Sequence, residues 1–201
     1  MSEGYLPDKR LQLDFQRAVD LLPKFITDDD IRRYLGPTFP IFKYSELDDI
    51  QHISHILPED KCCCIILVES TYNTGHFVAL ARKGDVIIQF DSYGVSIDHE
   101  LNYVTKMMQR ILGAEKNALK DLIKNSGMKT IYNKTKYQST KEIYGVDSSI
   151  CGRACIVFCQ LFKLGYTLEE MKILIDNKRD HYEMIFMIEF PIDLTFCFLI
   201  P

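Results

Sequence analysis

Apolar side chains recur at helical spacing through much of the first third of the chain. The pattern predicts three helices there, over residues 11–25, 28–36 and 45–58. The first should stop around Pro23, because proline cannot continue a helix. The second should begin after Thr27, a good N-cap, with the carboxylates of Asp28 to Asp30 complementing the helix dipole.

Strand patterns fill the middle of the chain. Cys62 to Val68 is an unbroken apolar run, which is typical of a strand buried on both faces. Two β-prone segments follow, His76 to Arg82 and Val86 to Asp91. Lys83-Gly84-Asp85 between them is a good turn sequence, so the two segments are predicted to form a β-hairpin.

Helical spacing returns in the second half, where helices are predicted over 101–112, 114–123, 151–164 and from a capping box at Thr167 and Glu170 to about Asn177. Residues 125–150 are polar and loop-like, and residues 182–200 are β-prone. Helices and strands are partly segregated, which predicts the α+β class. No repeat or linker divides the chain, so we expect a single domain over residues 1–201.

Composition fits a soluble globular domain of 201 residues, 47% apolar and 26% charged, with a net charge of −4. Seven cysteines are too few for a disulfide scaffold, and their odd number indicates a reducing compartment. Met1 to Arg10 lacks the pattern of a secretory leader, and charges interrupt the apolar stretch Met184 to Pro201. We therefore expect neither secretion nor a membrane span.

Lysines are concentrated between Lys116 and Lys141, where seven of them accompany one carboxylate, Asp121. Such a segment is either a solvated helix face and loop, or a surface that attracts DNA or an acidic peptide. The sequence has no glycine-rich phosphate loop and no zinc-finger spacing. No cofactor or metal is expected.

Cys151 begins a predicted helix, directly after Ser148 and Ser149, either of which could be its N-cap. Free N–H groups and the helix dipole would stabilise a thiolate at that position. Gly152 would leave room there for a substrate backbone. The further cysteines on this helix, Cys155 and Cys159, are more typical of core packing.

A thiolate nucleophile needs an imidazole base and a group that orients it. Pairing of the predicted hairpin brings His76 and Asp91 to neighbouring positions, within reach of a carboxylate–imidazole hydrogen bond. His52 and His55 lie three residues apart, but no matching ligands accompany them, so a metal site is not expected.

Five segments carry a further signal: 27–47, 75–80 (GHFVAL), 90–94 (FDSYG), Gln138-Ser139 and 147–158. They resemble the adenain and SUMO-deconjugase group of cysteine proteases, and most of all the maturation proteases of virophages and polinton-type DNA viruses. The candidate residues in these segments follow the order of that group along the chain: His, Asp, Gln, Cys. The resemblance implies an adenain-like fold with a central mixed sheet packed by helices.

The resemblance further implies Cys151 as nucleophile, His76 as general base and acid, Asp91 as the orienting carboxylate and Gln138 as an oxyanion-hole donor. It implies an endopeptidase that processes capsid and other structural precursors, in the virion and the virus factory of the host cell. The chain departs from the group in two ways. Phe77 replaces a frequent tryptophan, and Gln138 stands thirteen residues before Cys151, further than is usual in the group. Either residues 140–146 are a loop insertion, or Gln138 is not the oxyanion-hole residue.

Other functions stay open at the level of sequence. The same catalytic residues would serve a deconjugase that cleaves ubiquitin-like modifiers, or an acyltransferase. A non-catalytic module could instead bind DNA or an acidic peptide through the lysine-rich segment. In a protease, that segment could hold an activating DNA or peptide.

Overall fold

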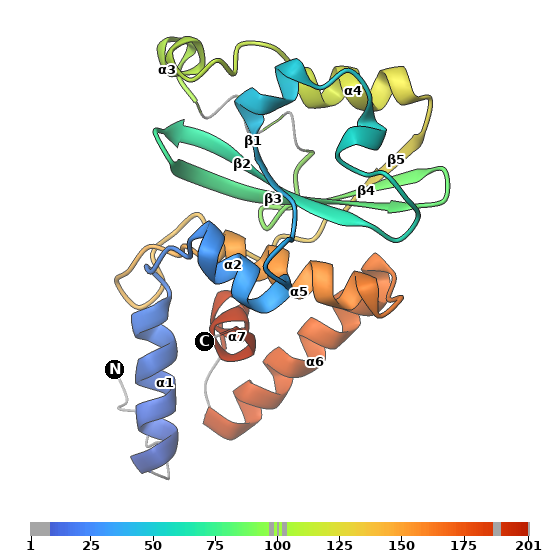
Figure 1. Cartoon of the computed structure of the whole chain (residues 1–201). Coiled ribbons are helices and arrows are strands. Elements are labelled where there is room, and N and C mark those ends of the chain that lie inside the picture. Colours follow the sequence, from blue (N-terminus) through green and yellow to red (C-terminus); the bar gives the residue numbers. More distant parts are fainter. Residues whose placement is uncertain (1–8, 97–98, 100, 102–103, 187–189, 201) are drawn as a thin grey trace.

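The computed structural model describes residues 9–96, 99, 101, 104–186 and 190–200, and a five-stranded mixed sheet lies at its centre. Helices cover both faces of this sheet (Figure 1). One apolar core lies between the sheet and α1, α2, α5, α6 and α7, and a second between the sheet, two 3₁₀ turns and α4. The expected α+β class, with a central mixed sheet packed by helices, is confirmed.

The strands follow the chain in order across the sheet: β1 (Ile41–Lys43), β2 (Cys63–Thr71), β3 (Thr74–Lys83), β4 (Val86–Phe90) and β5 (Lys129–Tyr132). The three central strands are antiparallel, and each edge strand is parallel to its neighbour. Side chains of β2 alternate between the two cores, with Ile65 and Leu67 in one and Cys64 and Ile66 in the other. The predicted burial of this strand on both faces is confirmed.

The helices are α1 (Lys9–Leu21), α2 (Asp28–Leu35), α3 (Lys106–Ile111), α4 (Ala118–Ser126), α5 (Cys151–Lys163), α6 (Leu168–Phe186) and α7 (Ile192–Leu199). Thr27 caps α2 in a capping box with Asp30, as the sequence predicts. Thr167 and Glu170 form the second predicted box, at the start of α6.

Two of the predicted helices differ from the structure. The segment 45–58 is not one helix but two 3₁₀ turns, η1 (Tyr44–Asp49) and η2 (Ile53–His55), because Ile50 is extended and the His52 side chain caps η2. The predicted helix over 101–112 is reduced to α3, which begins after its N-cap Thr105; residues 102 and 103 lie outside the described part.

Two other segments were assigned the wrong structure from their sequence. Part of the expected 125–150 loop is β5, a four-residue edge strand whose side chains are all exposed. Its two apolar side chains, Ile131 and Tyr132, stand in an otherwise polar segment and form no strand pattern. The β-prone end of the chain is helical, in α6 and α7. Its aromatic side chains pack together across the two helices, and this packing overrides their β propensity; they include Tyr182, Phe186, Phe190 and Phe198.

Candidate active site

His76 and Asp91 meet at the open end of the β3–β4 hairpin. Strand pairing sets Ala79 opposite Phe90, so Asp91, the residue after β4, comes level with Val78, two residues along β3 from His76. The His76 Nε2 lies 3.2 Å from Asp91 Oδ2, and Asp91 is buried. The predicted carboxylate–imidazole pair is therefore present. With Nε2–H donating to Asp91, the Nδ1 atom of His76 is left for the thiol side.

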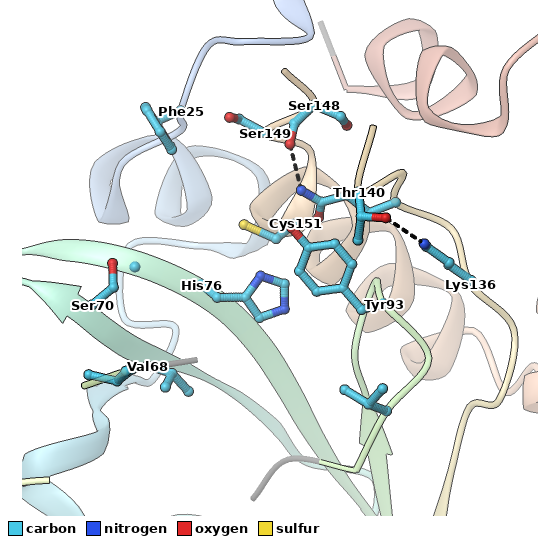
Figure 2. Close-up of a pocket in the computed structure, with 14 residues that line it drawn as sticks. Phe25, Val68, Ser70, His76, Tyr93, Lys136, Thr140, Ser148, Ser149 and Cys151 are labelled. Atoms are coloured by element: carbon cyan, nitrogen blue, oxygen red, sulfur yellow. Dashed lines mark hydrogen bonds between the residues drawn. The ribbon is translucent and has the colours of Figure 1, made fainter. Parts of the chain in front are cut away.

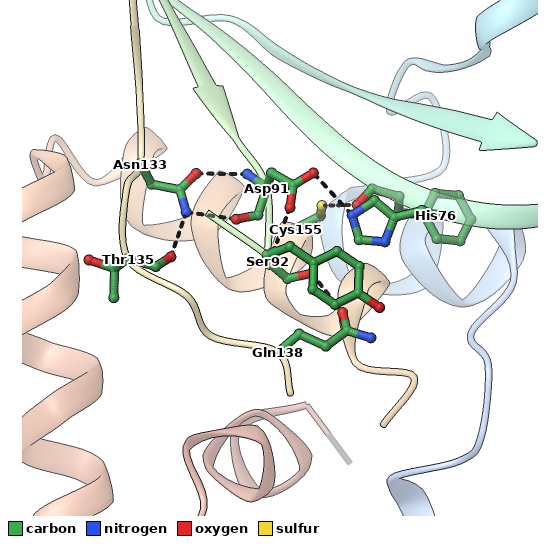
Figure 3. A network of polar contacts seen from close by, with 9 residues as sticks. His76, Asp91, Ser92, Asn133, Thr135, Gln138 and Cys155 are labelled. Carbon is green, nitrogen blue, oxygen red and sulfur yellow. Dashed lines mark hydrogen bonds and ion pairs between the residues drawn. The ribbon is translucent and has the colours of Figure 1, made fainter. Parts of the chain in front are cut away.

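Asp91 is fixed by contacts that the sequence did not reveal (Figure 3). The Tyr93 N–H donates to its Oδ1 at 2.5 Å. Asn133 is a buried side chain after β5, and its Oδ1 accepts from the Asp91 N–H at 2.7 Å while its Nδ2 donates to the Asp91 carbonyl at 2.6 Å. Asn133 belongs to the segment expected to be a loop, and no local sequence signal distinguishes it.

The ring of Tyr93 stacks on the imidazole of His76, with centroids 4.9 Å apart and an interplanar angle of 22°. An aromatic face favours a cation above it, so this contact stabilises a protonated imidazole. Tyr93 also lines the cleft described below.

Cys151 is the first residue of α5 and only 6% exposed. Burial by itself would raise the pKa of its thiol. The charge of His76, a hydrogen bond with the imidazole, and the N–H groups of Phe77 and Gly152 outweigh burial and leave the pKa of Cys151 lowered. Figure 2 shows the sulfur and the imidazole facing the same space between α5 and β3.

The predicted N-cap of α5 is wrong. The cap residue is Ile150, which makes no side-chain capping bond. Ser148 instead donates its hydroxyl to Asp193 at 2.5 Å, and the Ser149 N–H donates to the Leu22 carbonyl at 2.7 Å. The helix start is thus held by tertiary contacts rather than by its own cap.

Arg153 anchors α5 to two distant parts of the chain. Its guanidinium is 3% exposed and donates to the carbonyl of Lys24 at 2.8 Å and to that of Ile200 at 3.0 Å. Both acceptors are backbone oxygens, so these bonds partly satisfy the buried charge.

The role predicted for Gly152, room for a substrate backbone, differs from the one that the structure shows. A Cβ at this position would lie 2.5 Å from Ile26 Cγ1 and 3.2 Å from Phe77 Cδ2. The missing side chain therefore leaves room for the segment between α1 and α2 and for β3, instead of for a substrate backbone.

We expect Gly152→Ala to lower the free energy of unfolding by about 1–3 kcal/mol, because the added methyl overpacks the contact with Ile26. Denaturant unfolding measures this loss. The double variant Ile26→Ala/Gly152→Ala should lose less than the two single changes together. Additive losses would show that Ile26 is not the side chain that excludes the methyl group.

Gln138 lines the same cleft as Cys151 in spite of the long interval in sequence. Its Oε1 accepts from the Ser92 hydroxyl at 2.7 Å, and its Nε2 donates to the Ser148 carbonyl at 2.7 Å. The interval contains a tight turn at Tyr144 and Gly145, which both have positive φ, and the Tyr144 ring packs edge-on against Phe15 of α1. The structure therefore brings Cys151, His76, Asp91 and Gln138 together.

A cleft of about 550 Å³ opens over these residues. Its walls include His76, Gln138 and Cys151, together with further residues: Phe25, Val68, Ser70, Val95, Val104 and Thr140. The thiol is therefore reached from a groove with both apolar and polar walls, large enough for several residues of an extended peptide.

The remaining cysteines have other surroundings than Cys151; the pKa of Cys63 on β2 is also lowered, but through a hydrogen bond with Cys159 rather than through an imidazole. All seven are free, and Cys155 and Cys159 are fully buried in the core, as expected. Cys155 donates to the Phe77 carbonyl at 3.4 Å. Cys62 is half-buried, and burial raises the pKa of its thiol.

Among the lysines of the basic segment, Lys116 forms an ion pair with Asp48 at 3.0 Å. Lys136 borders the cleft, and its Nζ donates to the Thr140 hydroxyl at 3.2 Å. A role of this segment in holding DNA or an acidic peptide stays a prediction.

No known family model matches the chain. It is similar to the uncharacterized protein V9 of Sputnik virophage, with 28% identity over 160 residues that span 79% of this chain and 87% of that protein. The likeness supports a virophage relationship. In the described ranges, no helix combines the length and apolarity needed to cross a bilayer.

Proposed function

We propose that this chain is a cysteine endopeptidase with Cys151 as nucleophile, His76 as general base and acid, and Asp91 as the residue that orients the imidazole. The observation that carries the proposal is the thiol at the start of α5, whose pKa is lowered despite burial because His76 lies beside it. The His76–Asp91 hydrogen bond completes the arrangement that nucleophilic catalysis requires.

The reaction would be an acyl transfer in two halves. The Cys151 thiolate attacks the scissile carbonyl, and the oxyanion that forms is held by the Gln138 amide and the Cys151 N–H. His76 gives its proton to the leaving amine, which leaves a thioester on Cys151. His76 then takes a proton from water, the resulting hydroxide attacks the thioester, and the carboxylate product leaves as the thiol is restored.

The substrates would be precursors of viral structural proteins, cut after small residues such as glycine, within the virion or the virus factory. Two things support this part of the proposal: the resemblance to viral maturation proteases and the similarity to a virophage protein. The mixed sheet packed by helices is compatible with an adenain-like fold.

The experiment is co-expression with candidate viral capsid precursors, followed by mass-spectrometric mapping of new termini. Wild type should produce defined cuts that are absent with Cys151→Ala. Identical termini in both samples would overturn the proposal. Rapid labelling of Cys151 by a ubiquitin or SUMO probe with a C-terminal electrophile, without any precursor cleavage, would redirect it to a deconjugase.

Thiol reactivity gives a second test that needs no substrate. Because its pKa is lowered, Cys151 should remain thiolate below the ordinary titration range near 8.5 and be alkylated by iodoacetamide at neutral pH. Cys62 provides the internal control, since the pKa of its thiol is raised. Peptide mass spectrometry against pH measures both rates, and equal titration of the two thiols would contradict the proposed active site.

A further inference from the structure

The amide of Gln138 is oriented by a network that extends well beyond the catalytic residues. The carbonyl of Ser148 fixes which end of the amide is which, because a carbonyl oxygen only accepts and so must face Nε2, at 2.7 Å. The Ser92 hydroxyl then donates to Oε1 at 2.7 Å. The Ser92 carbonyl also accepts from the N–H groups of Tyr137 and Gln138, at 2.7 and 2.9 Å. Nε2 must then point away from Ser92, toward the Ser148 carbonyl and the cleft.

An amide nitrogen carries two hydrogens. The Ser148 carbonyl accepts one of them at 2.7 Å. The second is left for an oxygen in the cleft, where the oxyanion of the proposed reaction would form. The position of Ser148 therefore decides where this donor points.

Asp193, near the start of α7, holds the backbone on both sides of this contact. Its Oδ1 accepts from the Ser139 N–H at 2.8 Å and from the Ser148 hydroxyl at 2.5 Å. Ser139 directly follows Gln138, and Ser148 supplies the carbonyl that its amide contacts. Asp193 is 2% exposed, so water does not replace these bonds easily.

We infer that Asp193 is a positioning residue for the oxyanion hole: its single oxygen clamps Ser139 and Ser148 and thereby aims the Gln138 amide at the substrate carbonyl. The inference rests on the proposed protease function. Helix α7 lies far from the proposed catalytic residues in sequence. Through Asp193 it would contribute to stabilising the transition state.

The test separates the oxyanion hole from the thiol by using two probes. Iodoacetamide alkylates the thiolate without forming an oxyanion, whereas the aldehyde acetyl-Gly-glycinal adds to the thiolate to give a hemithioacetal whose oxygen occupies the hole. The aldehyde concentration that halves the alkylation rate of Cys151 reports its affinity. Both measurements use the intact chain and need no identified substrate.

Asp193→Ala should lower the affinity for the aldehyde by about tenfold or more, because loss of an oxyanion donor lowers transition-state stabilisation by a factor of this size or larger. Its alkylation rate with iodoacetamide should stay at the wild-type value. Asp193→Asn should behave like wild type, because its Oδ1 can still accept both bonds. Ser148→Ala removes only the hydroxyl that Asp193 accepts from, and it should also lower the affinity for the aldehyde. This variant tests the inference if Asp193→Ala does not fold.

A double-mutant cycle with Gln138→Ala excludes a merely structural role. If Asp193 acts through the amide, Asp193→Ala should cause no further loss in the Gln138→Ala background. The inference is overturned if Asp193→Ala and Ser148→Ala keep wild-type affinity, or if Asp193→Ala causes the same loss in both backgrounds. Failure of the aldehyde to protect wild-type Cys151 would overturn the proposed function itself, and the inference with it.

Discussion

If the chain is the proposed endopeptidase, replacing His76 by alanine is expected to reduce peptide cleavage by about a thousandfold or more, because the change removes both the proposed general base and the positive charge beside the thiol. Burial then raises the pKa of Cys151 without the charge and the hydrogen bond of His76, which oppose it in the wild type. The sign follows directly: the pKa of Cys151 should rise, and the thiolate fraction at neutral pH should fall.

Cleavage rates and the pH dependence of alkylation measure the two effects in the same variant. The control is His181→Ala, which removes an exposed imidazole on α6 far along the chain from the site. It should leave both readouts unchanged. A His76→Ala variant that kept the wild-type alkylation profile would show that the imidazole does not set the state of the thiol.

Asp91→Asn is expected to lower kcat by a factor of about 10³ to 10⁴, which is the loss of kcat typical of a catalytic triad whose carboxylate is replaced by an amide. An asparagine of the same shape can present its N–H to the ring, which then favours the wrong imidazole tautomer. The loss should lie in kcat, because Asp91 is buried behind His76 and does not line the cleft.

Steady-state kinetics separate kcat from KM for this variant. Asp85→Asn, at the exposed turn of the same hairpin, is the matched control and should have wild-type kinetics. Equal losses in both variants would assign the effect to the hairpin as a whole. A change confined to KM would contradict the role of Asp91 behind the imidazole.

The sequence was most informative where partners are joined by a short hairpin. His76 and Asp91 are fifteen residues apart, and the turn at Gly84 alone brings them together. Helical spacing likewise located the start of α5 and with it Cys151. The meeting of the thiol and the imidazole depends on the packing of α5 against β3, which no local pattern contains.

Other parts of the site depend on polar residues whose partners lie far away in the chain. Asn133 contacts Asp91 across 42 residues, and Asp193 contacts Ser148 across 45. Their immediate sequences are those of an ordinary polar loop and an apolar tail. The role expected for Gly152 failed for the same reason, since the neighbour that explains it is Ile26.

The anchoring of Arg153 has a consequence for the order of folding events during synthesis. Arg153 follows Cys151 by two residues, and its guanidinium donates to the carbonyls of Lys24 and Ile200. A growing chain that ends shortly after Arg153 lacks the second of these acceptors, so the guanidinium cannot yet be buried with both partners and α5 is not yet fixed against the sheet. The environment that lowers the pKa of Cys151 should therefore be complete only after residue 200 has been made.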